Sequence, residues 1–459
     1  MVKEYKGIHK ISGSLIVIKN THGATVGDMA EVHLQNGEVH RARVLEVNND
    51  HLVAMLYDSG CDISPSTSKF RVPGKPFELP MSEDMLGRVF NGMGTPIDNG
   101  PEILAEVYKN ISPPPANPLS RVLPTQFIQT GISAIDAVAS IACGQKIAVF
   151  SAGRIPHVKL LMQLAKQATT LGADADRFTV VIGAIGITFE ESEYIINEVS
   201  SSDAVDRSVL FINTASDPIM HRIAAPRVAL TAAEYLAFTK GRNVLVLLTD
   251  MTNYCEALRE LSIHKREPSL RYGYPAYLRY DLASIYERAG KYKTEGDTEG
   301  SITLIPFLTM PCDDFFGPIA DITSETTEGK IVLSPDLLKR GISPPIDVCS
   351  TLSYLKSRCT GTFKTREDHT ELVTQLVAAY VTGRNAIKSI SKFGETAFTD
   401  YNLQFARFAD GFETRLINQG YHESKSINTT LDLGWELLST LPRAELKKIS
   451  NDLIEKYMP

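Results

Sequence analysis

The stretch KIAVFSAGRIPHVKLLMQLAKQA, residues 146–168, decides the fold of this chain. It opens with an apolar strand, KIAVF (146–150), which runs into a glycine-containing turn, SAGRIPH (151–157). Apolar residues then recur at i, i+3, i+4 and i+7, the spacing of a helix with one buried face, at Leu161, Leu164, Ala165 and Ala168. A strand, a short turn and a helix in this order are typical of a layered α/β sheet.

The turn resembles a phosphate-binding loop but lacks the residues that bind phosphate. In such a loop, GxxxxGK[ST], backbone N–H groups surround the phosphates, the lysine neutralises charge and the hydroxyl holds magnesium. Here the turn contains Ser151, Gly153, Arg154, Pro156 and His157, with no lysine–hydroxyl pair. Proline also has no N–H to donate. We therefore expect this degenerate P-loop to bind no nucleotide in the isolated chain.

Size and composition are those of an ordinary globular protein. The chain has 459 residues, 43% apolar and 22% charged, and its length suggests about three domains of ~150 residues. A net charge of −7 argues against a nucleic-acid-binding surface. The sequence contains no apolar run of ~18 residues that would span a membrane, and its N-terminus lacks the apolar core of a signal peptide.

Cysteines and histidines give no sign of a disulfide framework or a metal site. The six cysteines lie far apart without a CxxC pair, and the ten histidines show no HExxH or similar spacing. We expect reduced thiols in a cytosolic protein that binds no metal.

The chain divides into three predicted domains. Residues 1–75 contain short strands, including HLVAMLY (51–57) and a hairpin around Asn36-Gly37, and predict a small β-barrel. Residues 76–352 begin with a Gly/Pro-rich connector of loops and turns. From Gly144 onward, apolar strands alternate with helical segments, which predicts a doubly wound α/β domain with a degenerate nucleotide-binding site.

The third predicted domain, residues 353–459, is a helical bundle. Apolar stripes at helical spacing predict that Trp435 and three phenylalanines lie in its core: Phe405, Phe408 and Phe412. Pro442 is expected just inside the last helix. Glu367 and Asp368 are expected at a solvated helix start.

The remaining groups for ATP hydrolysis are mostly missing. The strand VLVLLTD (244–250) ends in Asp250, where a Walker B strand has its carboxylate, but without a P-loop we favour a turn or helix cap. No carboxylate follows the strand at 179–183, where a catalytic base would project. Glu190 and Glu191 come later and are expected to cap a helix. The chain alone is not expected to hydrolyse ATP.

A barrel, a P-loop-type core and a helical bundle in this order resemble the head subunits of rotary ATPases. The sequence is similar to the non-catalytic B subunit of the vacuolar/archaeal (V/A) type across essentially its whole length. The matching words include SEDMLGRVFNG (82–92), TQFIQTGISAID (125–136), PRVALTAAEYLAF (226–238), VLVLLTDMTNY (244–254), KTREDH (364–369) and LDLGWELL (431–438). That family also has a degenerate turn, similar to FSGSGLPH, at 150–157.

The resemblance implies that the chain is one subunit of a larger complex. Three B-type chains would alternate with three P-loop-bearing catalytic A-type chains in an A3B3 ring, with central-shaft and peripheral-stalk subunits. Mg-ATP or Mg-ADP would bind at the interface with the catalytic partner, and turnover would be coupled to H⁺ or Na⁺ transport. The chain would be cytoplasmic and would reach the membrane only through the complex. The resemblance also implies that such a chain supplies an arginine finger to its partner. In other nucleotide hydrolases, an arginine finger raises the rate by ~10³–10⁵-fold.

The sequence departs from the family at that finger. The family motif is similar to PPI[ND]VLPSLSRL, and this chain reads PPIDVCSTLSYL (344–355), so Tyr354 stands at the arginine position. A phenol cannot replace a charged, bidentate guanidinium. Arg358 would lie on the same face if the segment were helical. Tyr354, Arg358 and Ser353 are therefore the candidates for a trans pocket. A regulatory subunit that completes its partner's pocket and a catalytically silent scaffold both remain open.

Overall fold

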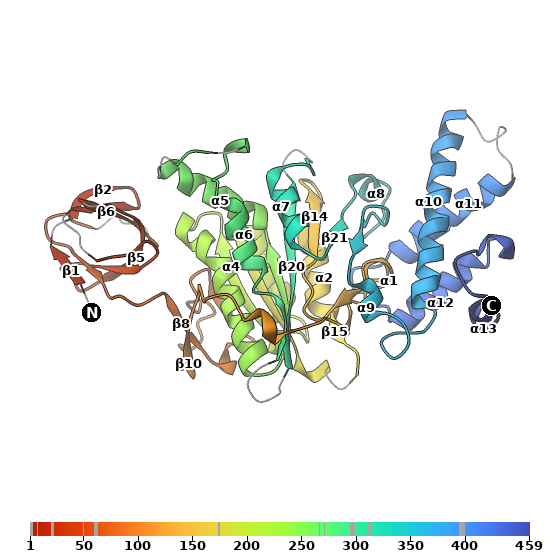
Figure 1. Ribbon diagram of the computed structural model, residues 1–459, viewed down its shortest axis with the longest axis horizontal. Helices are drawn as coiled ribbons and strands as arrows, with labels where there is room; N and C mark the ends of the chain where they lie inside the picture. The colour runs from red at the N-terminus through yellow and green to blue at the C-terminus, as the bar shows by residue number, and fades with distance from the viewer. Residues whose placement is uncertain are drawn as a thin grey trace.

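The computed structural model describes residues 3–459 except 7, 20–22, 49, 59–62, 173–174, 266, 270, 294–298, 311–313 and 394–399. The barrel, the α/β core and the C-terminal helices follow one another along its long axis (Figure 1). Cys61 and Cys312 lie outside the described residues. Cys255, Cys349 and Cys359 are free thiols.

The N-terminal part is a seven-stranded antiparallel sheet that curls into a small barrel (Figure 1). The predicted hairpin is confirmed, because β4 and β5 pair across a turn in which Gly37 has a φ of 93°. Val32, Val44 and Phe70 are fully buried inside the barrel. The strands lie in the order β1 (Lys3–Lys6), β7 (Lys69–Val72), β4 (Met29–His33), β5 (Val39–Val47), β6 (His51–Leu56), β3 (Leu15–Lys19) and β2 (Ile8–Ser12).

The central part is a mostly parallel sheet buried on both faces, as predicted. Along β16, Val180 and Ile182 join one apolar cluster, whereas Val181 and Ile185 join the other, because successive side chains point to opposite faces. The sheet order is β22 (Leu352–Ser353), β21 (Gly329–Val332), β14 (Ala148–Ala152), β20 (Glu299–Met310), β18 (Asn243–Thr249), β16 (Phe178–Ile187), β17 (Ser208–Thr214) and β9 (Val89–Asn91).

Helices lie between these strands along the chain. The helix that contains PRVALTAAEYLAF (226–238) begins at Ile219, so Pro226 stands inside it, and residues Tyr235–Thr239 form a π-helical turn. The helices are α1 (Ser133–Val138), α2 (His157–Gln167), α3 (Phe189–Ser200), α4 (Ile219–Glu234), α5 (Met251–His264), α6 (Leu278–Tyr286), α7 (Pro318–Thr326), α8 (Pro335–Lys339) and α9 (Lys356–Cys359).

The connector after residue 76 is more than loops and turns. Its strand β9 extends the main sheet by pairing in parallel with β17. Other short strands are β8 (Glu78–Met81) with β10 (Val107–Asn110), β11 (Arg121–Val122) with β19 (Gly290–Lys293), and β12 (Phe127–Gln129) with β13 (Ile141–Ala142) and β15 (Thr169–Thr170).

The C-terminal part contains α10 (His369–Phe393), α11 (Asp400–Gly411), a π-helical turn (Phe412–Ile417), α12 (Ile427–Leu438) and α13 (Asn451–Tyr457). Trp435 and the three phenylalanines are buried, as predicted. Two expectations are wrong. Pro442 precedes a single 3-10 turn, and the last helix begins only at Asn451. Asp368 is fully buried instead of solvated.

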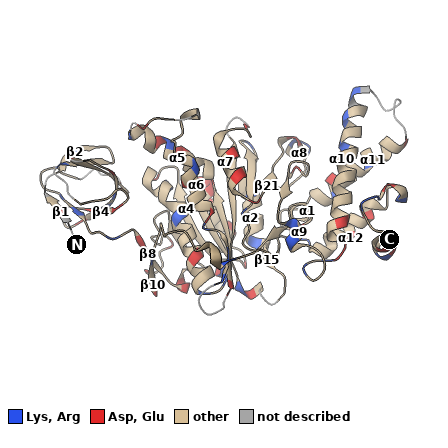
Figure 2. Ribbon diagram, viewed as in Figure 1, with Lys and Arg blue, Asp and Glu red and all other residues tan. Residues whose placement is uncertain are grey.

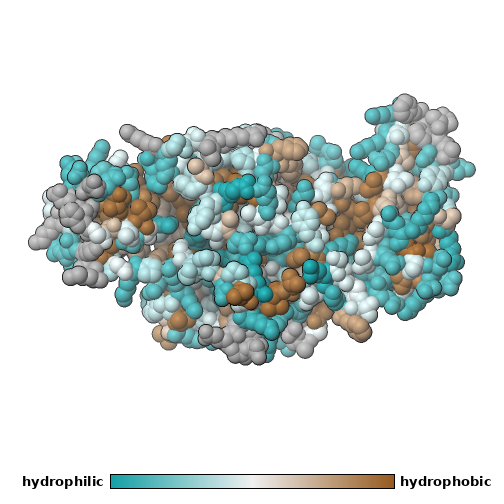
Figure 3. All heavy atoms as spheres, in the orientation of Figure 1, coloured by the Kyte–Doolittle hydropathy of each residue, from teal (hydrophilic) through white to brown (hydrophobic). Residues whose placement is uncertain are grey.

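The surface is mixed in character. Figure 2 shows both signs of charge scattered over all three parts. Figure 3 shows separate apolar patches over the barrel, the α/β core and the C-terminal helices. Within the described residues, none of the helices combines the length and the apolar composition that crossing a bilayer requires. The same residues hold no cluster of His, Cys, Asp or Glu side chains that could bind a metal ion.

Candidate functional site

In the turn between β14 and α2, two backbone N–H groups donate to carbonyl oxygens of the same turn. The N–H of Ile155 donates to the carbonyl of Ala152 at 3.1 Å, and the N–H of His157 donates to the carbonyl of Ile155 at 2.8 Å. Pro156, between them, has no N–H. A phosphate cradle needs such N–H groups to be free and convergent. This turn therefore does not offer these groups to an anion.

Among the side chains of the turn, the exposed Arg154 carries the only permanent positive charge. Ser151 is buried and its hydroxyl donates to the carbonyl of Ala152. Gly153 and Arg154 are exposed. His157 opens α2 with its Nε2 3.2 Å from the hydroxyl oxygen of Thr249. The first lysine of α2, Lys159, comes two residues after His157.

A cavity of about 560 Å³ lies beside the turn. The acidic and basic side chains in its lining are three carboxylates and two bases: Glu190, Glu191 and Asp250 with His157 and Lys159. Carboxylates repel an incoming anion. The lining therefore disfavours a triphosphate that arrives without a compensating metal.

Asp250 is the N-cap of α5. Its carboxylate accepts the N–H of Thr252 at 2.7 Å and the N–H of Thr309 at 3.1 Å, and only 6% of the residue is exposed. This geometry is that of a helix cap. Glu191 forms a capping box with Thr188 at the start of α3. Both carboxylates therefore have structural partners in the chain.

The second candidate region is the segment that follows β22. This short strand pairs antiparallel with β21, and the N–H of Tyr354 donates to the carbonyl of Glu328 at 2.9 Å. Gly329 makes the approach possible, because a Cβ at this residue would lie 2.5 Å from the carbonyl oxygen of Leu352. Tyr354 and Leu355 then form a turn before α9 begins.

The structure separates the three candidate side chains of this segment. Tyr354 is 65% exposed, and Arg358 is exposed on α9. Ser353 instead faces inward: its hydroxyl accepts from Gln145 at 2.9 Å and donates to the carbonyl of Ser140 at 3.1 Å. Because a turn precedes α9, Tyr354 and Arg358 do not lie on one continuous helix.

The permanent positive charge of this segment is that of Arg358. Within the described residues, its guanidinium takes part in no ion pair or side-chain hydrogen bond. Burial lowers the pKa of Lys356, the first residue of α9, to about 8, so this ammonium group is less firmly charged than an ordinary lysine at pH 7. Arginine stays charged in proteins.

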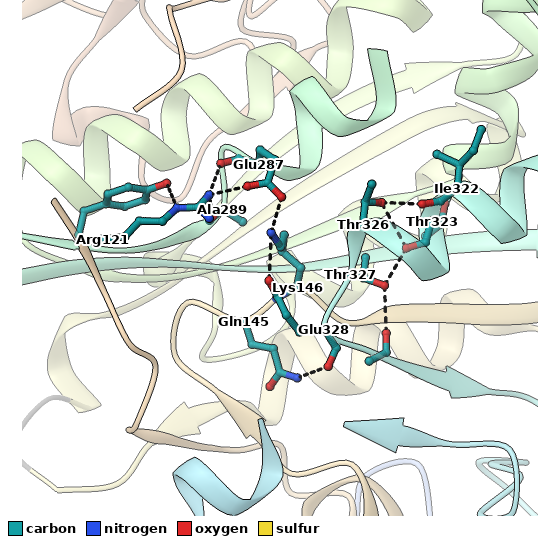
Figure 4. A network of polar contacts seen from close by, with 12 residues as sticks. Arg121, Gln145, Lys146, Glu287, Ala289, Ile322, Thr323, Thr326, Thr327 and Glu328 are labelled. Carbon is teal, nitrogen blue, oxygen red and sulfur yellow. Dashed lines mark hydrogen bonds and ion pairs between the residues drawn. The ribbon is translucent and has the colours of Figure 1, made fainter. Parts of the chain in front are cut away.

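A polar network behind this segment was not predicted (Figure 4). It joins Lys146, at the base of β14, to Glu287, just after α6, and to Glu328, just before β21. The only local signal was a polar pair, Gln145-Lys146, ahead of an apolar strand. Its partners lie 141 and 182 residues further along the chain, which local patterns do not reveal.

Fold and turn together define a class: an α/β protein of the P-loop ATPase type whose phosphate loop is degenerate. Residues 131–353 match the ATP synthase alpha/beta family, nucleotide-binding domain. Residues 359–458 match the C-terminal domain of V and A type ATP synthase. The chain therefore belongs to the ATP synthase alpha/beta family and carries the V/A-type C-terminal domain.

Solved structures that resemble most of the chain include two ATPase proteins. The ATP synthase subunit NeqB from Nanoarcheaum equitans is 35% identical, with 94% of this chain and 100% of NeqB covered and a TM-score of 0.74. The assembled ATPase EscN from the enteropathogenic E. coli type III secretion system is 22% identical, with 94% and 99% covered and a TM-score of 0.83. At that identity, the likeness to EscN shows the fold alone.

Proposed function

We propose that this chain is the non-catalytic, regulatory B subunit in the soluble head of a V/A-type rotary ATPase. Three copies would alternate with three catalytic A-type subunits and complete their ATP sites. The ring, with its central-shaft and peripheral-stalk subunits, would couple ATP hydrolysis or synthesis to H⁺ or Na⁺ transport. The observation that carries the proposal is the turn at 153–157, whose N–H groups at Ile155 and His157 bond within the chain.

The proposed contribution to the partner is the segment from Tyr354 to Arg358. The side chains of Tyr354 and Arg358 are both exposed. In nucleotide hydrolysis, a residue supplied by a neighbouring subunit acts mainly by stabilising the charge that develops at the γ-phosphate. Arg358 would supply the positive charge, and the phenol of Tyr354 would supply one hydrogen bond. Mg-ATP or Mg-ADP would lie at this interface and be held mainly by the catalytic chain.

Assembly is the primary test. Mixing this chain with a cognate P-loop-bearing catalytic chain should give an alternating hexamer by native mass measurement. Separate species under conditions in which the catalytic chain is folded would contradict the proposal. Isothermal titration of the isolated chain with Mg-ATP should show no binding below the millimolar range, and micromolar affinity would contradict our account of the turn.

A second function is favoured by Tyr354: a catalytically silent scaffold that assembles or regulates the ring. The variant Tyr354→Arg separates the two functions. A sharp rise in turnover of the assembled ring would place residue 354 at the nucleotide and mean that tyrosine attenuates catalysis. Normal turnover that falls in Arg358→Ala would assign the charge to Arg358. Turnover that responds to neither variant would support the scaffold.

A further inference from the structure

Lys146 is a buried cation between two carboxylates. Its side chain is 4% exposed, and its Nζ lies 2.7 Å from Oε1 of Glu287 and 3.0 Å from Oε1 of Glu328 (Figure 4). Glu287 also pairs with Arg121 at 2.7 Å. A buried ammonium group is tolerated only when it is paired and hydrogen-bonded. The pairing is therefore specific, and it fixes the side chain in one place.

Lys146 contacts both the carboxylate and the backbone N–H of Glu328. Besides the ion pair, its Oε2 accepts the backbone N–H of Lys146 at 2.6 Å. Its own N–H donates to the carbonyl of Lys146 at 2.7 Å. The two backbone contacts hold Glu328 against the base of β14. The ion pair, which alone of the three depends on the lysine side chain, fixes the direction of the Glu328 carboxylate.

The carbonyl of Glu328 in turn positions the exposed segment. It accepts the N–H of Tyr354 at 2.9 Å and the side-chain amide of Gln145 at 3.1 Å. Gln145 also donates to the hydroxyl of Ser353 at 2.9 Å. A continuous series of polar contacts therefore runs from Lys146 through Glu328 to the turn that precedes α9.

We propose that Lys146 is a positioning residue for the reaction in the neighbouring catalytic subunit. It touches no nucleotide. It fixes Glu328, and through Glu328 the turn at Tyr354 and the exposed Arg358 behind it. This assignment rests on the proposed function, which places that turn at the partner's ATP. A displacement of about 1 Å at a reacting site can lower a rate by ~10²-fold.

The variant Lys146→Met removes the charge and keeps an unbranched, apolar side chain of similar length. Glu287 and Glu328 are 48% and 34% exposed, so water can solvate the carboxylates that are left. Unlike a deeply buried orphan charge, they should not unfold the chain. The control is Lys291→Met, in which a 13% exposed lysine of β19 loses its ion pair with Glu299. That ion pair shares no residue with the contacts of Glu328.

The test measures ATP turnover of the assembled ring. We expect Lys146→Met to lower kcat about 10- to 100-fold with little change in KM, because a trans charge acts mainly on the transition state. The control should match the wild type. Combining Lys146→Met with Arg358→Ala should lower kcat no further than Arg358→Ala alone, since the lysine acts through the segment that carries the arginine.

Several results would overturn the inference. Turnover of Lys146→Met equal to the control would do so, as would additive losses in the double variant, since these indicate an independent structural effect. Should Lys146→Met fail to enter the ring, Glu328→Gln takes its place, with the same expected loss and the same additivity test. A chain that forms no ring, or a ring whose turnover responds to neither Tyr354→Arg nor Arg358→Ala, overturns the proposed function and this inference together.

Discussion

Asp368 is a fully buried carboxylate at the junction of the C-terminal helices. Arg366 donates to it twice, at 2.7 and 2.9 Å, and the indole N–H of Trp435 donates to its Oδ2 at 2.6 Å. The variant Asp368→Ala removes the acceptor for all three bonds. It leaves a guanidinium that is 17% exposed and an indole N–H in a residue that is 1% exposed.

The loss should be large for a single substitution. Removing one partner of a buried ion pair costs about 3–5 kcal/mol, because the other charge stays behind unpaired. Arg366 keeps a second ion pair, with the exposed carboxylate of Asp432, which moderates this cost. We therefore expect Asp368→Ala to lower the free energy of unfolding of the C-terminal domain by about 3–4 kcal/mol.

Trp435 makes the measurement specific to this domain, because it is the only tryptophan in the chain. Its fluorescence should follow unfolding in urea. With a slope of roughly 2 kcal/mol per molar, typical of a domain of this size, the midpoint should fall by roughly 1.5–2 M. Midpoints are compared instead of intensities, since the substitution itself alters the surroundings of the indole.

Glu367→Ala is the matched control. This neighbouring carboxylate is 40% exposed and pairs with Lys456, which is 60% exposed. Exposed pairs contribute about 0–1 kcal/mol, so the control midpoint should stay close to that of the wild type. Equal midpoints for Asp368→Ala and Glu367→Ala would refute the reasoning from burial.

Two further predictions concern the same helices. Burial lowers the pKa of His369 from 6.5 to about 4. Between these pH values the unfolded chain binds a proton at this residue and the folded chain does not, so the free energy of unfolding should fall by about 3 kcal/mol as pH drops from 6.5 to 4. In urea titrations, His369→Gln should remove this part of the pH dependence of stability. Gly383→Ala should destabilise by about 1–3 kcal/mol, because its Cβ would lie 2.2 Å from the carbonyl oxygen of Phe405. Gly411→Ala, whose Cβ would meet only Leu437 at 3.5 Å, should be neutral or stabilising by up to ~1 kcal/mol, and urea titrations of both variants measure the difference.

Local patterns predicted the three-part fold. The hairpin at Asn36-Gly37 and the strands of the α/β core form where alternation and apolar runs indicated, because these signals depend on neighbouring residues alone. The three-residue strand β9 gave no such signal, since it is too short to show a period. It becomes a strand because β17 offers a free edge.

Burial of polar residues was the part that sequence reasoning missed. Asp368 precedes a helix, which is where solvated caps are common, but its burial depends on Trp435, 67 residues away. Ser353 is next to the exposed Tyr354, yet strand alternation turns its hydroxyl toward Gln145, 208 residues away. Such contacts are set by tertiary packing, and one sequence does not show which distant residues meet.

The hydrogen bonds within the turn at 153–157 also affect whether the start of α2 keeps its conformation during a catalytic cycle. An empty phosphate cradle leaves N–H groups without partners, and unpaired buried donors cost free energy. Here the donors of Ile155 and His157 are satisfied inside the chain, and Pro156 has none. The start of α2 therefore needs no ligand to hold its shape. A subunit of this kind can keep one conformation while nucleotide binds to and leaves the neighbouring catalytic subunit. The carbonyl of Glu328 can hold the exposed segment at Tyr354 in place during the whole cycle. A fixed wall for a neighbour's active site requires both properties.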